Sequence, residues 1–119
     1  MLENKDAYAD SKQSLLIIEG GNRIEGEIKV QGAKNSSLPV LAAAFLCGGQ
    51  SVIHNCPALS DTYAACRILG SLGCKCARED ESVTVDSSEA IGYTVSEALM
   101  REMRSSIVFL GAVLGRTGR

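Results

Sequence analysis

The sequence predicts a mixed α/β (α+β) fold in which short strands alternate with amphipathic helices. Apolar residues recur at a period of two in some segments and at spacings of three and four in others. Glycines stand where one pattern gives way to the next. Of the 119 residues 45% are hydrophobic but only 4% aromatic, so the core must consist mainly of Leu, Ile, Val and Ala.

The pattern of residues 1–30 predicts a loose leader followed by a hairpin. Residues 1–13 are polar and lack the apolar segment of a secretory signal. Residues 14–19 (SLLIIE) form a short apolar run, and Gly20-Gly21-Asn22 is a turn signal. Residues 23–30 then place apolar side chains on one face at period two. We therefore expect two neighbouring strands, 14–19 and 23–30.

A helix is expected from about residue 36 to residue 47. The apolar stripe consists of Leu38, Leu41, Ala42, Phe45 and Leu46. Asn35 or Ser36 is a candidate N-cap, and Pro39 suits the first turn. Gly48-Gly49 ends the pattern.

The middle of the chain predicts strand, helix and hairpin. Residues 51–54 read as a strand, and 60–72 as a helix with Ser60 as N-cap and Asp61 in its first turn. Residues 74–79 and 82–86 pair as a hairpin. The resulting order is strand, helix, strand, helix, strand, strand.

The last part of the chain predicts a buried helix. Residues 95–103 are compatible with either a helical turn or an extended link. Residues 104–114 (RSSIVFLGAVL) are apolar on nearly every side, which is typical of a helix enclosed by others, but they are too few to span a membrane.

A shift of 70 residues superposes two similar segments. Lys34 falls on Arg104, Ala42 on Ala112 and Gly48 on Gly118. Each segment contains a basic residue, small polar residues, an apolar helix and a terminal glycine. A structural repeat and a chance similarity both remain open at this point.

Composition excludes several classes of partner. The net charge of −2 argues against nucleic acid or an anionic membrane surface as the main partner. The five cysteines are odd in number and follow no secretory signal, so we expect reduced thiols in the cytoplasm. Cys74 and Cys76 are too close for a zinc hairpin, and His54 is the only histidine. We expect no metal and no cofactor.

Lys34 is the main candidate for a functional residue. It stands between a glycine turn and the start of a helix, where unpaired N–H groups favour phosphate or carboxylate. The competing interpretation is an ordinary solvated surface lysine. Cys56 is expected to be an ordinary semi-buried thiol.

Four motifs resemble one enzyme family. They are GGNR followed by GEIKV, then GAKNSSLPVLAA from Gly32, PALSD from Pro57, and MRSSI with LG from Met103. Their order and spacing, from about Leu15 to the end, are similar to the N-terminal part of UDP-N-acetylglucosamine 1-carboxyvinyltransferases (UDP-N-acetylglucosamine enolpyruvyltransferases).

This resemblance implies a fold and a reaction. The family has two similar domains, each an inside-out α/β barrel of βαβαββ units; here one full unit and the start of a second are expected. Residues 14–33 would belong to the second domain and 34–119 to an incomplete first, catalytic domain. The reaction transfers an enolpyruvyl group from phosphoenolpyruvate to the 3′-hydroxyl of UDP-N-acetylglucosamine through a tetrahedral ketal, in the first committed step of bacterial peptidoglycan synthesis in the cytoplasm.

The resemblance also implies site residues. Lys34 and Asn35 match a pair that contacts phosphoenolpyruvate, and Arg104 matches an arginine that contacts the UDP-sugar. The catalytic cysteine and aspartate of the family would lie beyond Arg119. We therefore expect the chain alone to be inactive, to require the remainder of the enzyme as its partner, and to aggregate.

Two other interpretations remain. One is an EPSP synthase, which shares the fold but typically has Ser after the equivalent lysine. The other is a non-catalytic remnant that binds a nucleotide sugar or another protein.

Overall fold

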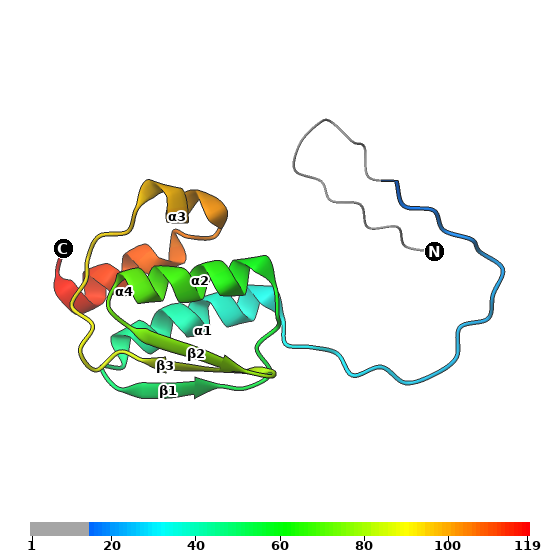
Figure 1. The fold of residues 1–119 in the computed structure, drawn as a ribbon, viewed down its shortest axis with the longest axis horizontal. Coiled ribbons are helices and arrows are strands. Elements are labelled where there is room, and N and C mark those ends of the chain that lie inside the picture. Colours follow the sequence, from blue (N-terminus) through cyan, green and yellow to red (C-terminus); the bar gives the residue numbers. More distant parts are fainter. Residues whose placement is uncertain (1–14) are drawn as a thin grey trace.

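The computed structural model describes residues 15–119, in which helices and strands alternate over most of the chain (Figure 1). The elements are, in order, α1 (Lys34–Leu46), β1 (Gln50–Ile53), α2 (Ser60–Ser71), β2 (Lys75–Glu79), β3 (Ser82–Asp86), α3 (Glu97–Glu102) and α4 (Val108–Thr117). The predicted mixed α/β class is confirmed. Of the two interpretations of residues 95–103, the helical one holds.

The three strands form one antiparallel sheet in the order β1-β3-β2. β3 is central and pairs Val85 with Ser51 on one side and with Cys76 on the other. Val83 and Val85 are fully buried, while their neighbours Ser82, Thr84 and Asp86 are not. This alternation places one face of the sheet under the helices, which all lie on that side in Figure 1.

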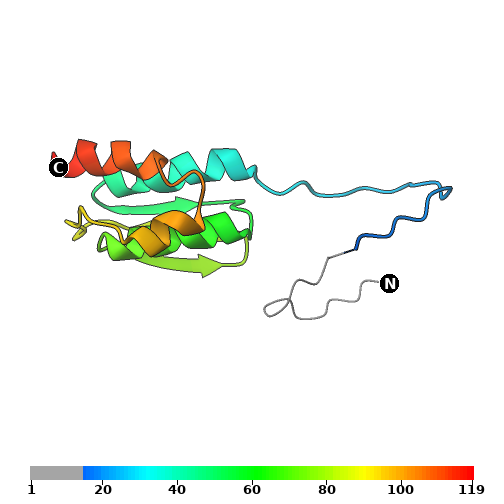
Figure 2. The same ribbon diagram turned by 90° about the horizontal axis from the view of Figure 1, so that it is seen from above.

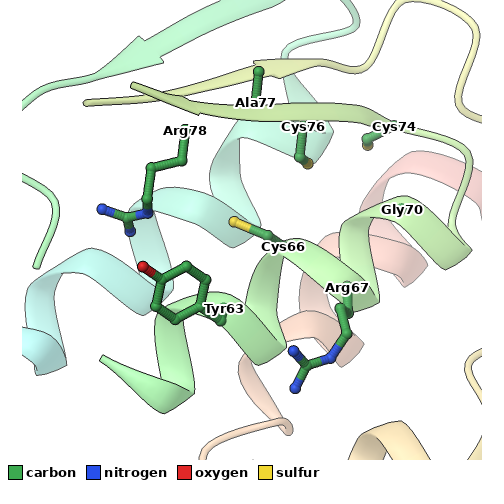
Figure 3. Close-up of a pocket in the computed structure, with 8 residues that line it drawn as sticks. All are labelled: Tyr63, Cys66, Arg67, Gly70, Cys74, Cys76, Ala77 and Arg78. Carbon is green, nitrogen blue, oxygen red and sulfur yellow. The ribbon is translucent and has the colours of Figure 1, made fainter. Parts of the chain in front are cut away.

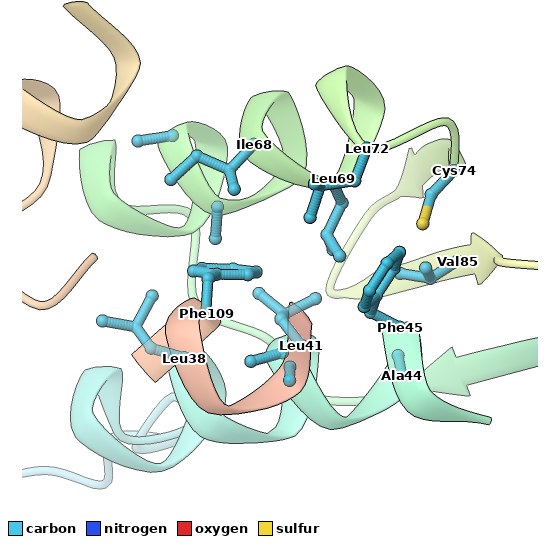
Figure 4. Packing of buried hydrophobic residues seen from close by; sticks show 14 of the residues in the cluster. Leu38, Leu41, Ala44, Phe45, Ile68, Leu69, Leu72, Cys74, Val85 and Phe109 are labelled. Atoms are coloured by element: carbon cyan, nitrogen blue, oxygen red, sulfur yellow. The ribbon is translucent and has the colours of Figure 1, made fainter. Parts of the chain in front are cut away.

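The core lies between α1, α2, α4 and the sheet. Phe45 of α1 and Phe109 of α4 are the largest fully buried side chains, and Leu41, Leu69 and Val85 pack around them (Figure 4). Both phenylalanines of the sequence therefore lie in the core, whereas Tyr63 and Tyr93 are exposed. Among residues 15–119, every helix is too short to cross a lipid bilayer.

The hairpin predicted for residues 14–19 and 23–30 does not form in the residues that the structure describes. Residues 15–33 form no strand, and their apolar side chains are exposed, with Leu15 at 82% and Ile24 at 96%. A strand is stabilised by hydrogen bonds to a neighbour and by an apolar face against which to pack. Within the described chain this segment has neither. The predicted leader, 1–13, lies outside the described residues.

Both predicted N-caps are also corrected. α1 begins at Lys34 with Ala33 at its N-cap, so neither Asn35 nor Ser36 has that role. α2 begins at Ser60 with Leu59 at its N-cap. There the Thr62 hydroxyl accepts a hydrogen bond from the Leu59 N–H at 3.2 Å, which satisfies one donor at the start of the helix.

The last helix is shorter and less enclosed than expected. α4 begins at Val108, and residues 104–107 form turns before it. Phe109, Ala112 and Val113 are buried, but Leu110 and Leu114 are about half exposed. Although α4 is apolar on nearly every side, only one side of it is covered among the described residues, because α1 is its main neighbour.

The internal similarity has a structural counterpart. α1 and α4 lie side by side and run in the same direction (Figures 1 and 2). The glycines at equivalent positions, Gly48 and Gly118, both adopt left-handed backbone angles, with φ of 66° and 70°. Glycine adopts this conformation at little cost. The two helix ends still differ, because Gly118 is the C-cap of α4, whereas Gly48 follows the C-cap of α1, Cys47.

Candidate functional site

The starts of α1 and α2 lie at the same end of the molecule, where residues 15–33 leave it (Figure 1). α4 runs in the same direction, with its start set further back along α1 (Figure 2). The N-terminus of a helix carries partial positive charge and unpaired N–H groups. This end of the molecule therefore favours an anion.

Lys34 bridges the two leading helix starts. Its Nζ lies 2.6 Å from Oδ2 of Asp61, in the first turn of α2. The Asp61 side chain is only 14% exposed, whereas that of Lys34 is 46% exposed. The carboxylate thus holds the ammonium group in place and leaves almost half of the lysine side chain accessible to a ligand.

A close backbone contact sets the approach to Lys34. The Gly32 N–H donates to Oδ1 of Asn55 at 3.2 Å, and a Cβ on Gly32 would lie 1.9 Å from the Asn55 carbonyl oxygen. Only glycine fits here. Asn55 itself has φ of 54°, a conformation that asparagine tolerates better than most residues. The glycine two residues before Lys34 was the only sequence signal for this contact.

The other two predicted site residues, Asn35 and Arg104, lie on different elements. Asn35 follows Lys34 in α1 and is exposed at the same helix start. Arg104 is exposed in the turn before α4, next to buried Met103. Among residues 15–119, its side chain makes no ion pair or hydrogen bond, so the structure does not join Arg104 to Lys34 directly.

Arg78, which the sequence did not single out, braces the loop that leads to α2. Its guanidinium donates to the carbonyl oxygens of Cys56 at 3.0 Å and Pro57 at 3.2 Å. It also lies 5.0 Å from the centre of the Tyr63 ring, within the range of a cation–π contact. Arg78 therefore connects β2 to the segment that positions Asp61.

Arg116 has a similar role at the opposite end of α1. It donates to the carbonyl oxygens of Phe45 and of Ser87, the latter at 2.6 Å, and stacks on the Phe45 ring at 4.8 Å. Cations near a helix C-terminus stabilise its free carbonyl groups. This contact fixes α4 against the end of α1.

The expected roles of cysteines and metals can be compared with the geometry. Cys56 is 2% exposed and packs in the core, so it is buried rather than semi-buried as expected. Within the described part of the chain, no group of three or more His, Cys, Asp or Glu side chains is placed to hold a metal ion.

Fold and site together define an α/β protein with a candidate anion site at adjacent helix starts. The family model of EPSP synthase (3-phosphoshikimate 1-carboxyvinyltransferase) matches residues 18–119. UDP-N-acetylglucosamine 1-carboxyvinyltransferase 2 of Caldanaerobacter subterraneus subsp. tengcongensis is 46% identical over 99 residues, covering 83% of this chain and 24% of that protein. UDP-N-acetylglucosamine 1-carboxyvinyltransferase 1 of Symbiobacterium thermophilum is 41% identical, covering 87% and 24%.

A solved structure agrees with these relatives. The enolpyruvyl transferase NikO from Streptomyces tendae superposes with a TM-score of 0.74 at 29% identity, over 83% of this chain and 23% of that one. The chain belongs to the EPSP synthase family of enolpyruvyl (carboxyvinyl) transferases. It spans about a quarter of the length of the curated relatives that it matches.

Proposed function

We propose that this chain supplies part of the substrate site of an enzyme that transfers an enolpyruvyl group from phosphoenolpyruvate to UDP-N-acetylglucosamine, for bacterial peptidoglycan synthesis. The single observation that supports it most is the position of Lys34, half exposed at a helix start and held by Asp61. The relatives at 36–46% identity carry the name of this activity.

Lys34 has the properties that the reaction needs at phosphoenolpyruvate. A dianionic phosphate and a carboxylate require a cation and N–H donors, and both are present at the start of α1. Addition of the sugar hydroxyl at C2 forms a tetrahedral ketal, which then loses phosphate. An ammonium group fixed beside the departing phosphate stabilises the charge that develops there.

Asn35 and Arg104 complete the proposed assignment. Asn35 would donate a hydrogen bond to phosphoenolpyruvate from the same helix start as Lys34. Arg104 would bind the diphosphate of the nucleotide sugar, for which a guanidinium fork is suited. Both side chains are exposed, as ligand-binding groups must be before the ligand arrives. Residues 14–33 would pair with a second domain, and 34–119 would begin the first barrel of βαβαββ units.

A chimera tests this proposal. Residues 18–119 replace the matching quarter of the Caldanaerobacter relative, and phosphate release from phosphoenolpyruvate is measured with UDP-N-acetylglucosamine present. We expect the chimera to turn over and Lys34→Ala to lower kcat by about 100-fold or more, the usual effect of losing one group that stabilises transition-state charge.

Lys29 provides the matched control. It is a mostly exposed lysine, 78% in its side chain, paired with Glu81 at 2.8 Å. Lys29→Ala should leave turnover within about twofold, because exposed ion pairs contribute little. Near-normal turnover by a folded Lys34→Ala chimera would remove the role assigned to Lys34.

The family match favours a second candidate acceptor, because its description names 3-phosphoshikimate. Titration of the 119-residue chain with each acceptor, followed by amide chemical shifts around Arg104, distinguishes the two. Shifts with UDP-N-acetylglucosamine alone support the first candidate. Shifts with 3-phosphoshikimate alone would replace it. Binding without turnover in the chimera would indicate a non-catalytic binding protein.

A further inference from the structure

A pocket of about 450 Å³ lies between α2 and β2 (Figure 3). α2 contributes Tyr63, Cys66, Arg67 and Gly70, and the strand side contributes Cys74, Cys76, Ala77 and Arg78. The proposed function uses none of its thiols. The thiols of this pocket are therefore free for a role of their own.

Two of these thiols face each other across the pocket. Cys66 projects from α2 toward the strand, and Cys76 projects from β2 toward the helix (Figure 3). Both thiols line the same pocket, and both residues are partly accessible. They stand on α2 and β2, which pack against each other and are joined by the short turn at Gly73.

The environment makes the two thiols unequal. The hydrogen bond from Cys76, and then the positive charges of Arg78 and Arg67, lower the pKa of Cys66 to about 7 despite its partial burial. The same hydrogen bond and burial raise the pKa of Cys76. A thiolate is the nucleophilic form of cysteine. At neutral pH, Cys66 is thus the thiol that can attack a peroxide. Cys76 stays protonated and can react afterwards with the oxidised Cys66.

We propose that Cys66 and Cys76 form a redox-active pair that a peroxide closes into a disulfide linking α2 to β2. The Cys66 thiolate attacks one peroxide oxygen, the O–O bond breaks, and Cys66 becomes a sulfenic acid; the departing hydroxide takes up the proton that Cys66 had lost and leaves as water. The Cys76 sulfur then attacks the Cys66 sulfur, the S–O bond breaks, and a second water leaves. Two thiols are oxidised, and the peroxide is reduced to two waters.

Cys74 lines the same pocket but is not part of the pair. It is only 7% exposed and belongs to the core cluster. Burial raises its pKa, so it stays a thiol at neutral pH. Cys74 is therefore a matched control in the same pocket.

Peptide mapping tests the proposal on the chain itself. The 119-residue protein is treated with hydrogen peroxide near neutral pH, blocked with iodoacetamide and digested with trypsin without reduction. Cleavage after Lys34, Arg67, Lys75 and Arg78 places Cys66 in peptide 35–67, Cys74 in 68–75 and Cys76 in 76–78. Peptide 35–67 also contains Cys47 and Cys56, which iodoacetamide blocks. We expect a linked species of 35–67 and 76–78, about 2 Da lighter than the sum of the two peptides with Cys47 and Cys56 alkylated and the two linking thiols free.

Cysteine variants decide which sulfur is used. Cys66→Ser and Cys76→Ser should each abolish the linked species, whereas Cys74→Ser and the exposed-thiol variant Cys47→Ser should retain it. The rate of its formation should also rise with pH through about 7 as Cys66 loses its proton. A link that survives Cys66→Ser, a link to 68–75, or wild-type Cys66 oxidised without any link would overturn the proposal.

Discussion

At the scale of single residues, a few side chains position the helix starts. Gly32 allows the chain to pass against Asn55, Asp61 holds Lys34, and Arg78 holds the loop before Asp61. Each acts through a contact between residues more than 20 positions apart in the sequence. The lysine alone could be recognised from its motif, but the groups that hold it could not.

Replacement of Arg78 tests whether its hydrogen bonds stabilise the loop before α2. Arg78→Met keeps the apolar stem but removes hydrogen bonds to the Cys56 and Pro57 carbonyl oxygens. We expect the free energy of unfolding to fall by roughly 2–3 kcal/mol, because charged hydrogen bonds are lost and buried acceptors remain. Urea unfolding, followed by circular dichroism, measures it.

Arg67→Met is the matched control. Arg67 is 53% exposed and pairs only with Glu102 at the surface, so its loss should cost less than about 1 kcal/mol. A loss of unfolding free energy for Arg78→Met as small as that for Arg67→Met would show that Arg78 is an ordinary surface arginine.

At the scale of elements, the ends of helices and the turns depend on close backbone approaches. The Gly92 N–H donates to the Leu72 carbonyl oxygen at 2.9 Å, and a Cβ on Gly92 would lie 2.7 Å from the Leu72 backbone. This contact docks the segment after β3 onto the end of α2. Gly111 in α4 differs, because a Cβ there would meet nothing within 4 Å among the described residues.

Alanine at these two glycines should have opposite effects. Gly92→Ala must displace the Leu72 backbone, which we expect to lower the free energy of unfolding by about 1–3 kcal/mol. Gly111→Ala removes only the conformational freedom of glycine in a helix, so it should raise that free energy by about 0.5–1 kcal/mol. Urea titrations of the two variants give both values, and a stabilising Gly92→Ala would contradict the contact.

At the scale of the whole molecule, much apolar surface is uncovered. The segment before α1 exposes Leu15, Ile18, Ile24 and other aliphatic side chains. Ile107, at the N-cap of α4, and Leu110 and Leu114 within α4 form a second exposed stripe. The stripe has the spacing of one helix face. Contiguous exposed apolar surface promotes association.

We therefore expect the 119-residue chain to self-associate. Replacing Leu110 and Leu114 together with Lys should shift the sedimentation profile toward monomer and leave the helical circular dichroism unchanged, because both side chains are already about half exposed. Replacing buried Phe109 with Lys is the contrasting control and should unfold the chain. A wild-type chain that sediments as a monomer and melts in one sharp transition would contradict this expectation.

The sequence by itself determined the order of elements from α1 to β3 and the position of Lys34 at a helix start. These features depend on local periodicity, on glycine positions and on the motif that begins at Gly32, all of which can be read from neighbouring residues. It also predicted that glycines end both helices, and Gly48 and Gly118 do adopt left-handed backbone angles after α1 and α4.

Tertiary structure decided what depends on distant partners. The strands predicted in 14–30 do not form over the described residues, because the alternating pattern of a strand does not supply the neighbour that it needs. The ion pair of Lys34 with Asp61, the Arg78 brace and the facing thiols of Cys66 and Cys76 all join separate elements. Such contacts depend on how helices pack on the sheet, which local spacing does not encode.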